Sequence, residues 1–315
     1  MKYTFKKCIV FIISLFLTSF LTFTAFEVIP GDSALSALGM DASKEHLEEY
    51  RKAMGLDKSL PIRYINWLKG AIKGDFGYSS SYQMQMKVST LIKNRLIVTL
   101  WLAILSFLII VLVSIPLGIL SARKKNGILD DLITLVTQIF MSVPSFFLAM
   151  IITLIFGITL KWFRPGDYIS PEDNFGGFLR FMMYPAIAVA IPKIAMMVKF
   201  LRSSLLREME LDYVRTAKSK GMTKISILFG HILKNALIPV ITFLAMVLAD
   251  ILAGAILVEQ VFNLPGLGRL LVTSIANRDY AVVHVIVLYI ASLVIIINFI
   301  VDLIYQWIDP RVRRD

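Results

Sequence analysis

Residues 96–122 read LIVTLWLAILSFLIIVLVSIPLGILSA and contain no charged residue. Because a helix rises about 1.5 Å per residue, roughly 20 apolar residues are enough to cross about 30 Å of membrane hydrocarbon. The run exceeds that length and lacks the ionisable side chains that make insertion into a bilayer costly. It therefore predicts a membrane-spanning helix.

Five further apolar runs reach a similar length, and the composition agrees with them. Hydrophobic residues make up 57% of the chain and charged residues only 17%, against about 25% charged residues in soluble domains. The mean hydropathy of +0.74 also excludes a disordered chain. The sequence thus predicts an all-α polytopic membrane protein with six transmembrane helices. The five further runs are residues 8–26, 132–160, 181–200, 235–258 and 280–301.

The basic residues predict how the chain is oriented. Cytoplasmic loops of membrane proteins are enriched in Lys and Arg, and eight of these fall within 199–236 but only three within 161–180. We therefore expect both termini to be cytoplasmic. The predicted parts are an N-terminal span at 1–28, an extracytoplasmic segment at 29–95 with helices over 43–54 and 61–72, a five-helix core at 96–307 with a cytoplasmic loop at 201–236, and a cytoplasmic tail at 308–315.

Neither nucleic-acid binding nor catalysis is indicated. The net charge of +11 comes from basic residues spread over separate loops, whereas phosphate binding needs a continuous basic face. His46, His231 and His284 lie in three different predicted segments without metal-ligand spacing, and Cys8 is the single cysteine. The chain has no G-x-x-x-x-G-K-[ST] loop with which to hydrolyse ATP. We expect a transport protein without a cofactor or metal rather than an enzyme.

The loop between the fourth and fifth predicted spans has helical spacing. Apolar residues recur every three or four positions from Leu206 to Ala217, and Gly221 follows as a helix C-cap would. One helix is therefore expected over 205–221, and a second short helix is expected from Thr223 into the fifth span. The pattern alone is more typical of an amphipathic connector lying on the membrane surface.

This loop also resembles a known family motif. Residues 212–221, DYVRTAKSKG, and residues 231–239, HILKNALIP, resemble the E-A-A-x-x-x-G loop of ABC importer permeases, in particular the oligopeptide and dipeptide branch. The E-A-A positions are matched only in part, and Lys234 replaces the family's later proline. The resemblance implies that the loop docks into an ATPase cleft through an exposed face that includes Tyr213 and Ala217. The residues implied in this coupling are Tyr213, Arg215, Thr216, Ala217, Lys218 and Gly221.

Other stretches extend the resemblance over nearly the whole chain. VEQVFNLPGLGRLL at 258–271, NRDY at 277–280 and SIPLG at 114–118 resemble the same permeases. In that family the first of these is a re-entrant element that helps to close the outer end of the path. An ordinary interfacial turn remains the alternative, because proline and glycine favour turns. The residues implied in the outer gate are Phe262, Pro265, Gly266 and Gly268.

Two ionisable residues interrupt predicted spans, Lys193 and Asp250. Such residues generally line a pathway or form a buried pair. Lys193 could instead extend its ammonium to the inner interface, and a wet outer cavity could solvate Asp250.

The resemblance implies a permease subunit in the bacterial cytoplasmic membrane. Such a subunit pairs with a second, related permease and two cytoplasmic ATPase subunits, and it receives peptides from an external solute-binding protein. Permeases for nickel chelates, metallophores or other small solutes are similar, so the substrate stays open. A proton-coupled secondary carrier, with Lys193 and Asp250 as its relay, is the alternative from a different class of protein.

Overall fold

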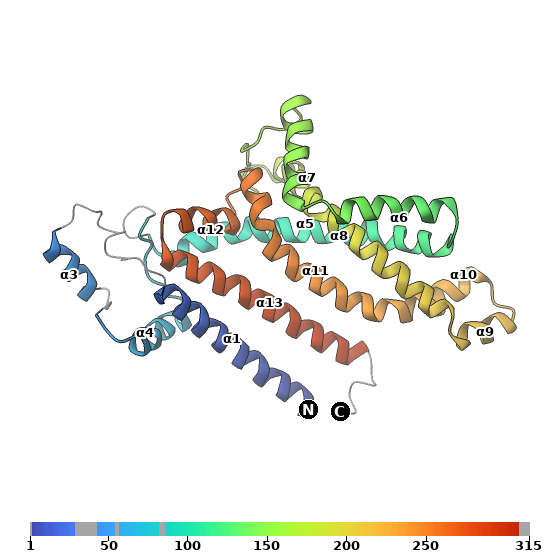
Figure 1. The fold of residues 1–315 in the computed structure, drawn as a ribbon, viewed down its shortest axis with the longest axis horizontal. Coiled ribbons are helices and arrows are strands. Elements are labelled where there is room, and N and C mark those ends of the chain that lie inside the picture. Colours follow the sequence, from blue (N-terminus) through green and yellow to red (C-terminus); the bar gives the residue numbers. More distant parts are fainter. Residues whose placement is uncertain (1, 29–42, 54–56, 82–85, 309–315) are drawn as a thin grey trace. The chain divides into compact units, whose positions relative to one another are not determined.

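The computed structural model describes residues 2–28, 43–53, 57–81 and 86–308. Within these ranges the chain is helical and has no β-strand, which confirms the predicted all-α class for this part of the protein. Residues 29–42, 54–56 and 82–85 of the predicted extracytoplasmic segment, and all but the first residue of the predicted tail, lie outside the described residues. In chain order the helices are α1 (Lys2–Val28), α3 (Lys44–Ala53), α4 (Leu60–Ile72), α5 (Val88–Arg123), α6 (Ile128–Met141), α7 (Ser145–Ile152), the π-helix η1 (Thr153–Thr159), α8 (Phe175–Met209), α9 (Asp212–Ser219), α10 (Lys224–Ile227), the π-helix η2 (Leu228–Ile232), α11 (Leu233–Val261), α12 (Leu267–Ala276) and α13 (Tyr280–Ile308) (Figure 1).

Five helical stretches among the described residues are long and apolar enough to cross a membrane, and a sixth span is possible if one bent pair counts as a single span. The five stretches correspond to five of the six predicted runs. They are Lys7–Phe26, Val88–Arg123, Phe175–Met209, Lys224–Leu252 and Tyr280–Val301.

The remaining run, 132–160, is not one continuous helix. Helix α6 ends at Met141, and the following helical stretch, Ser145–Thr159, is bent away from it by 96°. Pro144 is the N-cap of α7 and has extended backbone angles, φ −62° and ψ 145°. Proline also disfavours helical angles in the residue before it, here Val143. The absence of charge in this run predicted a span, but the proline divides it.

Contacts within the chain define two compact units, Met1–Thr99 with Pro265–Ile296, and Leu100–Leu264 with Ile297–Asp315. This division is based on contacts between helices, whereas the boundaries expected from the sequence are the ends of predicted membrane spans. Those boundaries therefore stay predictions.

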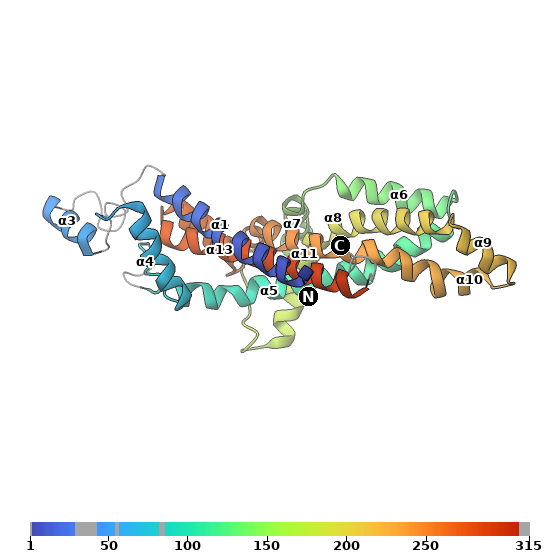
Figure 2. The ribbon, with the colours of Figure 1, turned by 90° about the horizontal axis from the view of Figure 1, so that it is seen from below.

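The first unit is organised around aromatic side chains. Tyr64 of α4 is 5% exposed, and its hydroxyl shares a 2.8 Å hydrogen bond with that of Ser19 in α1. The ring of Phe23 in α1 contacts both Tyr64 and His284 of α13, at centroid distances of 5.4 and 5.6 Å. Helices α1 and α13 accordingly run side by side in Figures 1 and 2.

In the second unit α8 is the central helix, because α6, α7 and α11 all pack against it. In its most apolar stretch, 61% of the residues are buried. Helices α5 and α8 approach each other closely at Gly118 of α5, where an added Cβ would meet Leu201 Cδ2 of α8 at 2.8 Å. Gly118 belongs to the SIPLG stretch, so this part of the sequence pattern corresponds to a close approach of two helices.

Candidate functional sites

Helix α9 ends in a turn that requires glycine. The N–H of Met222 donates to the Ala217 carbonyl at 3.3 Å, and the N–H of Gly221 donates to the Lys218 carbonyl at 3.0 Å. These two bonds form a Schellman motif. Gly221 has φ +78°, in the left-handed region that glycine adopts without strain. The predicted glycine C-cap is confirmed.

The helix before this turn is shorter than expected. Helix α8 ends at Met209, and Leu211 is extended, with φ −75° and ψ 151°, before α9 begins at Asp212. A carboxylate at a helix N-terminus stabilises it through the helix dipole, so Asp212 favours a new start. The single helix expected over 205–221 is therefore wrong, and α9 is a separate helix.

The two faces of α9 differ in burial. Val214 and Ala217 lie one turn apart and are only 1% and 8% exposed, so Ala217 belongs to the inward apolar stripe. The expectation that Ala217 lies on the exposed face is wrong. Tyr213 is half-buried, and burial raises the pKa of its hydroxyl, which donates to Glu208 Oε2 at 2.8 Å. The implied coupling residues that are exposed are Arg215, Thr216, Lys218 and Gly221.

The expected second short helix is confirmed. It is α10, whose N-cap Thr223 accepts a hydrogen bond from the Ser226 N–H. The chain then continues through η2 into α11 without a break. Lys234, where the family has proline, lies in the first turn of α11.

A buried ion pair supports the end of the second unit at which α9 lies (Figure 1). Asp130 of α6 is 2% exposed, and Arg202 of α8 donates to both its carboxylate oxygens at 2.7 Å. Ser121 Oγ, in the last turns of α5, and the N–H of Asn126 also donate to Asp130, at 2.5 and 3.1 Å. This carboxylate thus joins three helices. Sequence reasoning missed it, because Asp130 and Arg202 are 72 positions apart.

Of the implied gate residues, Phe262 lies in the second unit. It is fully buried, and its ring stacks on that of Phe163 with the centroids 5.7 Å apart. Phe163 also contacts Tyr184 of α8 at 4.3 Å. After Phe262, Asn263 takes the left-handed conformation with φ 58°, which turns the chain at the end of α11. The Phe262 side chain is therefore held in place by aromatic packing.

The other three implied gate residues, Pro265, Gly266 and Gly268, lie in the first unit. Gly266 is the N-cap of α12, and both glycines are buried. The N–H of Leu267 donates to Thr99 Oγ1 of α5 at 2.9 Å. With ten residues, α12 is too short to cross a membrane. The segment is thus a largely buried apolar helix, and its function as a gate stays a prediction.

Asp279, in the NRDY stretch, is a second buried carboxylate that sequence reasoning did not single out. It is fully buried, and the Ser79 and Ser81 hydroxyls donate to its Oδ2 at 2.5 and 2.9 Å. The Ser81 N–H donates to the same oxygen at 3.2 Å. Asp279 thereby fastens the segment after α4 to the start of α13. The NRDY pattern was the available signal, but its partners are about 200 positions away.

Lys193 of α8 and Asp250 of α11, which the sequence presented as two separate features, form an ion pair. The Lys193 side chain is 19% exposed and that of Asp250 is 55% exposed. Pairing was one of the two expected arrangements, but this pair is not buried, because the Asp250 side chain is more than half exposed. Whether it lines a pathway stays a prediction.

These features define a multi-pass helical membrane protein with a short helix and glycine turn between two of its spans. No group of three His, Cys, Asp or Glu residues that could hold a metal occurs in the part of the chain that the structure describes. Residues 114–314 match the family described as binding-protein-dependent transport system inner membrane component, and residues 1–103 match its N-terminal family. The chain belongs to this family, and it is a transport permease of the cytoplasmic membrane.

Several relatives match over nearly their whole length. A putative peptide transport system permease protein of Brucella abortus is 37% identical over 299 residues, which cover 95% of each chain. A probable peptide ABC transporter permease protein of Sinorhizobium fredii is 33% identical, with 92% of each chain covered. The oligopeptide transport system permease protein AppB of Bacillus subtilis is 33% identical, with 93% of each chain covered.

Proposed function

We propose that the chain is one of two permease subunits of an ATP-driven importer, and that it forms with a second, related permease the path for peptides. Full-length similarity to relatives named as peptide permeases supports this substrate class. ATP hydrolysis belongs to two cytoplasmic ATPase subunits, since the chain has no P-loop. An external solute-binding protein is proposed to deliver the peptide, and the description of the family as binding-protein-dependent supports this.

The observation that carries the proposal is the projecting helix α9 with its glycine turn. Because Val214 and Ala217 hold α9 against the protein, its exposed residues form a fixed surface for the ATPase. The exposed Arg215 pairs with Asp212 at 3.5 Å, so this surface carries charges of both signs. The exposed Gly221 leaves room for close approach. Since α9 lies between α8 and α10, a push on it reaches two spans directly.

The path itself is proposed to lie along the face of α8 and α11 that carries Lys193 and Asp250. A carboxylate that is half exposed on the isolated chain cannot face lipid hydrocarbon without a large cost. Water in a pathway, or polar groups of the second permease, would satisfy it. Either alternative is consistent with the proposed path, because the second permease forms the other side of it.

Reconstitution tests this proposal. The chain, the second permease, the two ATPases and the binding protein are incorporated into liposomes, and accumulation of a labelled short peptide is measured. Accumulation should require ATP hydrolysis and the binding protein, while the purified chain alone should hydrolyse no ATP. Accumulation without either ATPase would contradict it. Competition by nickel chelates, rather than by unlabelled peptides, would reassign the substrate.

The Lys193–Asp250 pair also fits the alternative of a proton-coupled carrier, because such relays use paired ionisable groups inside spans. That alternative predicts uptake by the isolated chain when a pH gradient is imposed. It also predicts that Asp250→Asn abolishes this uptake. For the importer we expect no uptake by the isolated chain under the same gradient.

A further inference from the structure

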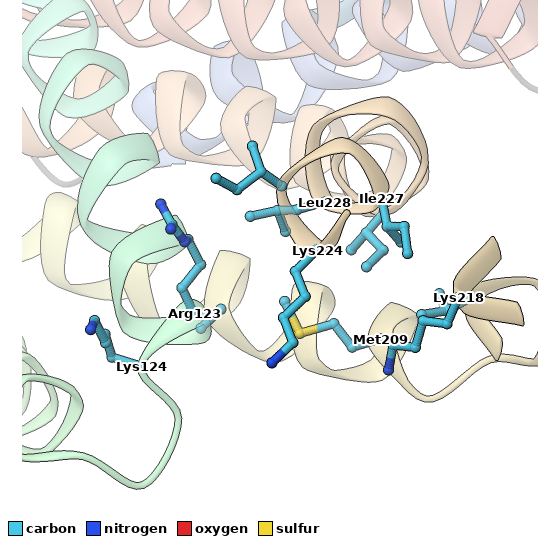
Figure 3. Close-up of a pocket in the computed structure, with 11 residues that line it drawn as sticks. Arg123, Lys124, Met209, Lys218, Lys224, Ile227 and Leu228 are labelled. Atoms are coloured by element: carbon cyan, nitrogen blue, oxygen red, sulfur yellow. The ribbon is translucent and has the colours of Figure 1, made fainter. Parts of the chain in front are cut away.

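A partly open pocket of about 320 Å³ lies beside α9 in the second unit (Figure 3). Its apolar lining comes from the end of α8, from α9 and from α10 with η2, and includes Met209, Val214, Ile227 and Leu228. Basic side chains line the remainder. They are Arg123, Lys124, Lys218 and Lys224.

Within the described residues, none of the four basic side chains forms an ion pair with a carboxylate. In Figure 3, Lys224 extends between Arg123 and Lys124 on one side and Lys218 on the other. Positive charge thus surrounds an apolar floor, which suits a ligand with an anionic head and an apolar body.

The pocket adjoins the end of a predicted span. Residues 96–122 contain no charge, and Ala122 and Arg123, at the end of this run, both line the pocket. This edge of the pocket therefore lies where a span leaves the hydrocarbon, and anionic lipids attract basic residues close to a span. Met209 and Lys224 lie on helical stretches that extend beyond the predicted spans 181–200 and 235–258.

We propose that this pocket binds an acidic phospholipid, with the phosphate held by the basic side chains and the first methylenes of an acyl chain against the apolar floor. The ligand would brace α9 against the ends of α5 and α8, so anionic lipid would support coupling. A pocket of this volume holds a headgroup with adjoining methylenes and not a whole lipid.

The geometry favours a lipid over an ATPase side chain. Val214 and Lys218 face the pocket. At 3.6 residues per turn, Thr216 and Ser219 lie about 200° and 140° around the helix from Val214. Both are exposed, so the far side of α9 remains free for an ATPase while the pocket is occupied.

Lipid binding to the purified full transporter tests the proposal. Binding of phosphatidylglycerol and of phosphatidylcholine is titrated in detergent by native mass spectrometry. The variant combines Lys124→Gln and Lys224→Gln, which leaves the proposed coupling residues unchanged. The control combines Lys199→Gln and Lys234→Gln, which removes the same charge at exposed residues outside the pocket.

Wild type and control should prefer phosphatidylglycerol. A basic residue near an anionic lipid surface contributes about fivefold, so the double variant should bind phosphatidylglycerol roughly thirtyfold more weakly. Phosphatidylcholine binding should not change. If the double variant is poorly folded, Lys224→Gln alone should show the fivefold loss.

Equal loss in the control would show a general charge effect and would overturn the proposal. Unchanged phosphatidylglycerol binding together with reduced recovery of the ATPase would also overturn it, and would assign the basic side chains to a protein contact. In nanodiscs, peptide-stimulated ATPase activity should rise with phosphatidylglycerol for wild type but not for the double variant. This measurement tests lipid dependence only. Wild-type ATPase activity that does not respond to phosphatidylglycerol would refute the lipid pocket, while ATP-driven uptake, which tests the importer function, would be unaffected.

Discussion

Replacement of Gly221 by aspartate would separate coupling from folding. No atom lies within 4 Å of where a Cβ at Gly221 would be, so the substitution meets no steric barrier. Its cost is the left-handed backbone, φ +78°, which is about 1–2 kcal/mol for a residue with a side chain. Domains are typically stable by about 5–15 kcal/mol, so the variant should fold and reach normal abundance. An unpaired carboxylate buried against the ATPase costs about 3 kcal/mol or more, which weakens that association more than about a hundredfold.

Gly74 provides a matched control. It also follows a helix, has φ +78°, and has no atom within 4 Å of an added Cβ. Gly74→Asp therefore carries the same backbone strain in the predicted extracytoplasmic segment. The assay compares membrane abundance, ATPase co-purification and peptide uptake for both variants. We expect Gly221→Asp to lose ATPase and uptake at normal abundance, and Gly74→Asp to retain both; normal ATPase recovery with Gly221→Asp would refute the coupling function of α9.

Three further predictions concern topology and stability. In a cysteine-free background, a cysteine at the exposed Ser59 should react with an impermeant thiol reagent in intact cells and one at Ser219 should not; labelling at Ser219 alone would invert the orientation. Asp279→Asn replaces an acceptor of several hydrogen bonds with a group that also donates, and should lower the free energy of unfolding by about 2–3 kcal/mol; an unchanged Tm in detergent would contradict this. Asp130→Ala and Arg202→Ala should each cost about 3–5 kcal/mol, because either leaves its partner charge uncompensated, while the double variant should cost less than their sum; additivity in a double-mutant cycle would show that the pair is not coupled.

Local sequence patterns were sufficient to predict most of the spans and the glycine turn of this protein. Span positions follow from runs of apolar residues, because the hydrocarbon thickness sets the required length whatever the fold. The glycine turn after α9 was predicted correctly because a C-cap depends on neighbouring backbone groups and on the absence of a Cβ at Gly221. The bend at Pro144 was equally local. The absence of charge in 132–160 predicts a span but does not report backbone geometry, so the bend was not predicted.

Only the tertiary structure shows which distant parts of the chain are in contact. Lys193 and Asp250 were each visible as a charge inside a span, but 57 positions separate them, and only the packing of α8 against α11 makes them a pair. Asp279 is held by hydroxyls about 200 positions away, and Asp130 by an arginine 72 positions away. Hydrophobic periodicity reports which face of a helix is buried and not which helix covers it. The apolar runs therefore determined that the chain crosses a membrane, while the assignment of buried polar partners required the packed helices, because a buried charge is tolerated only where the fold places its partner.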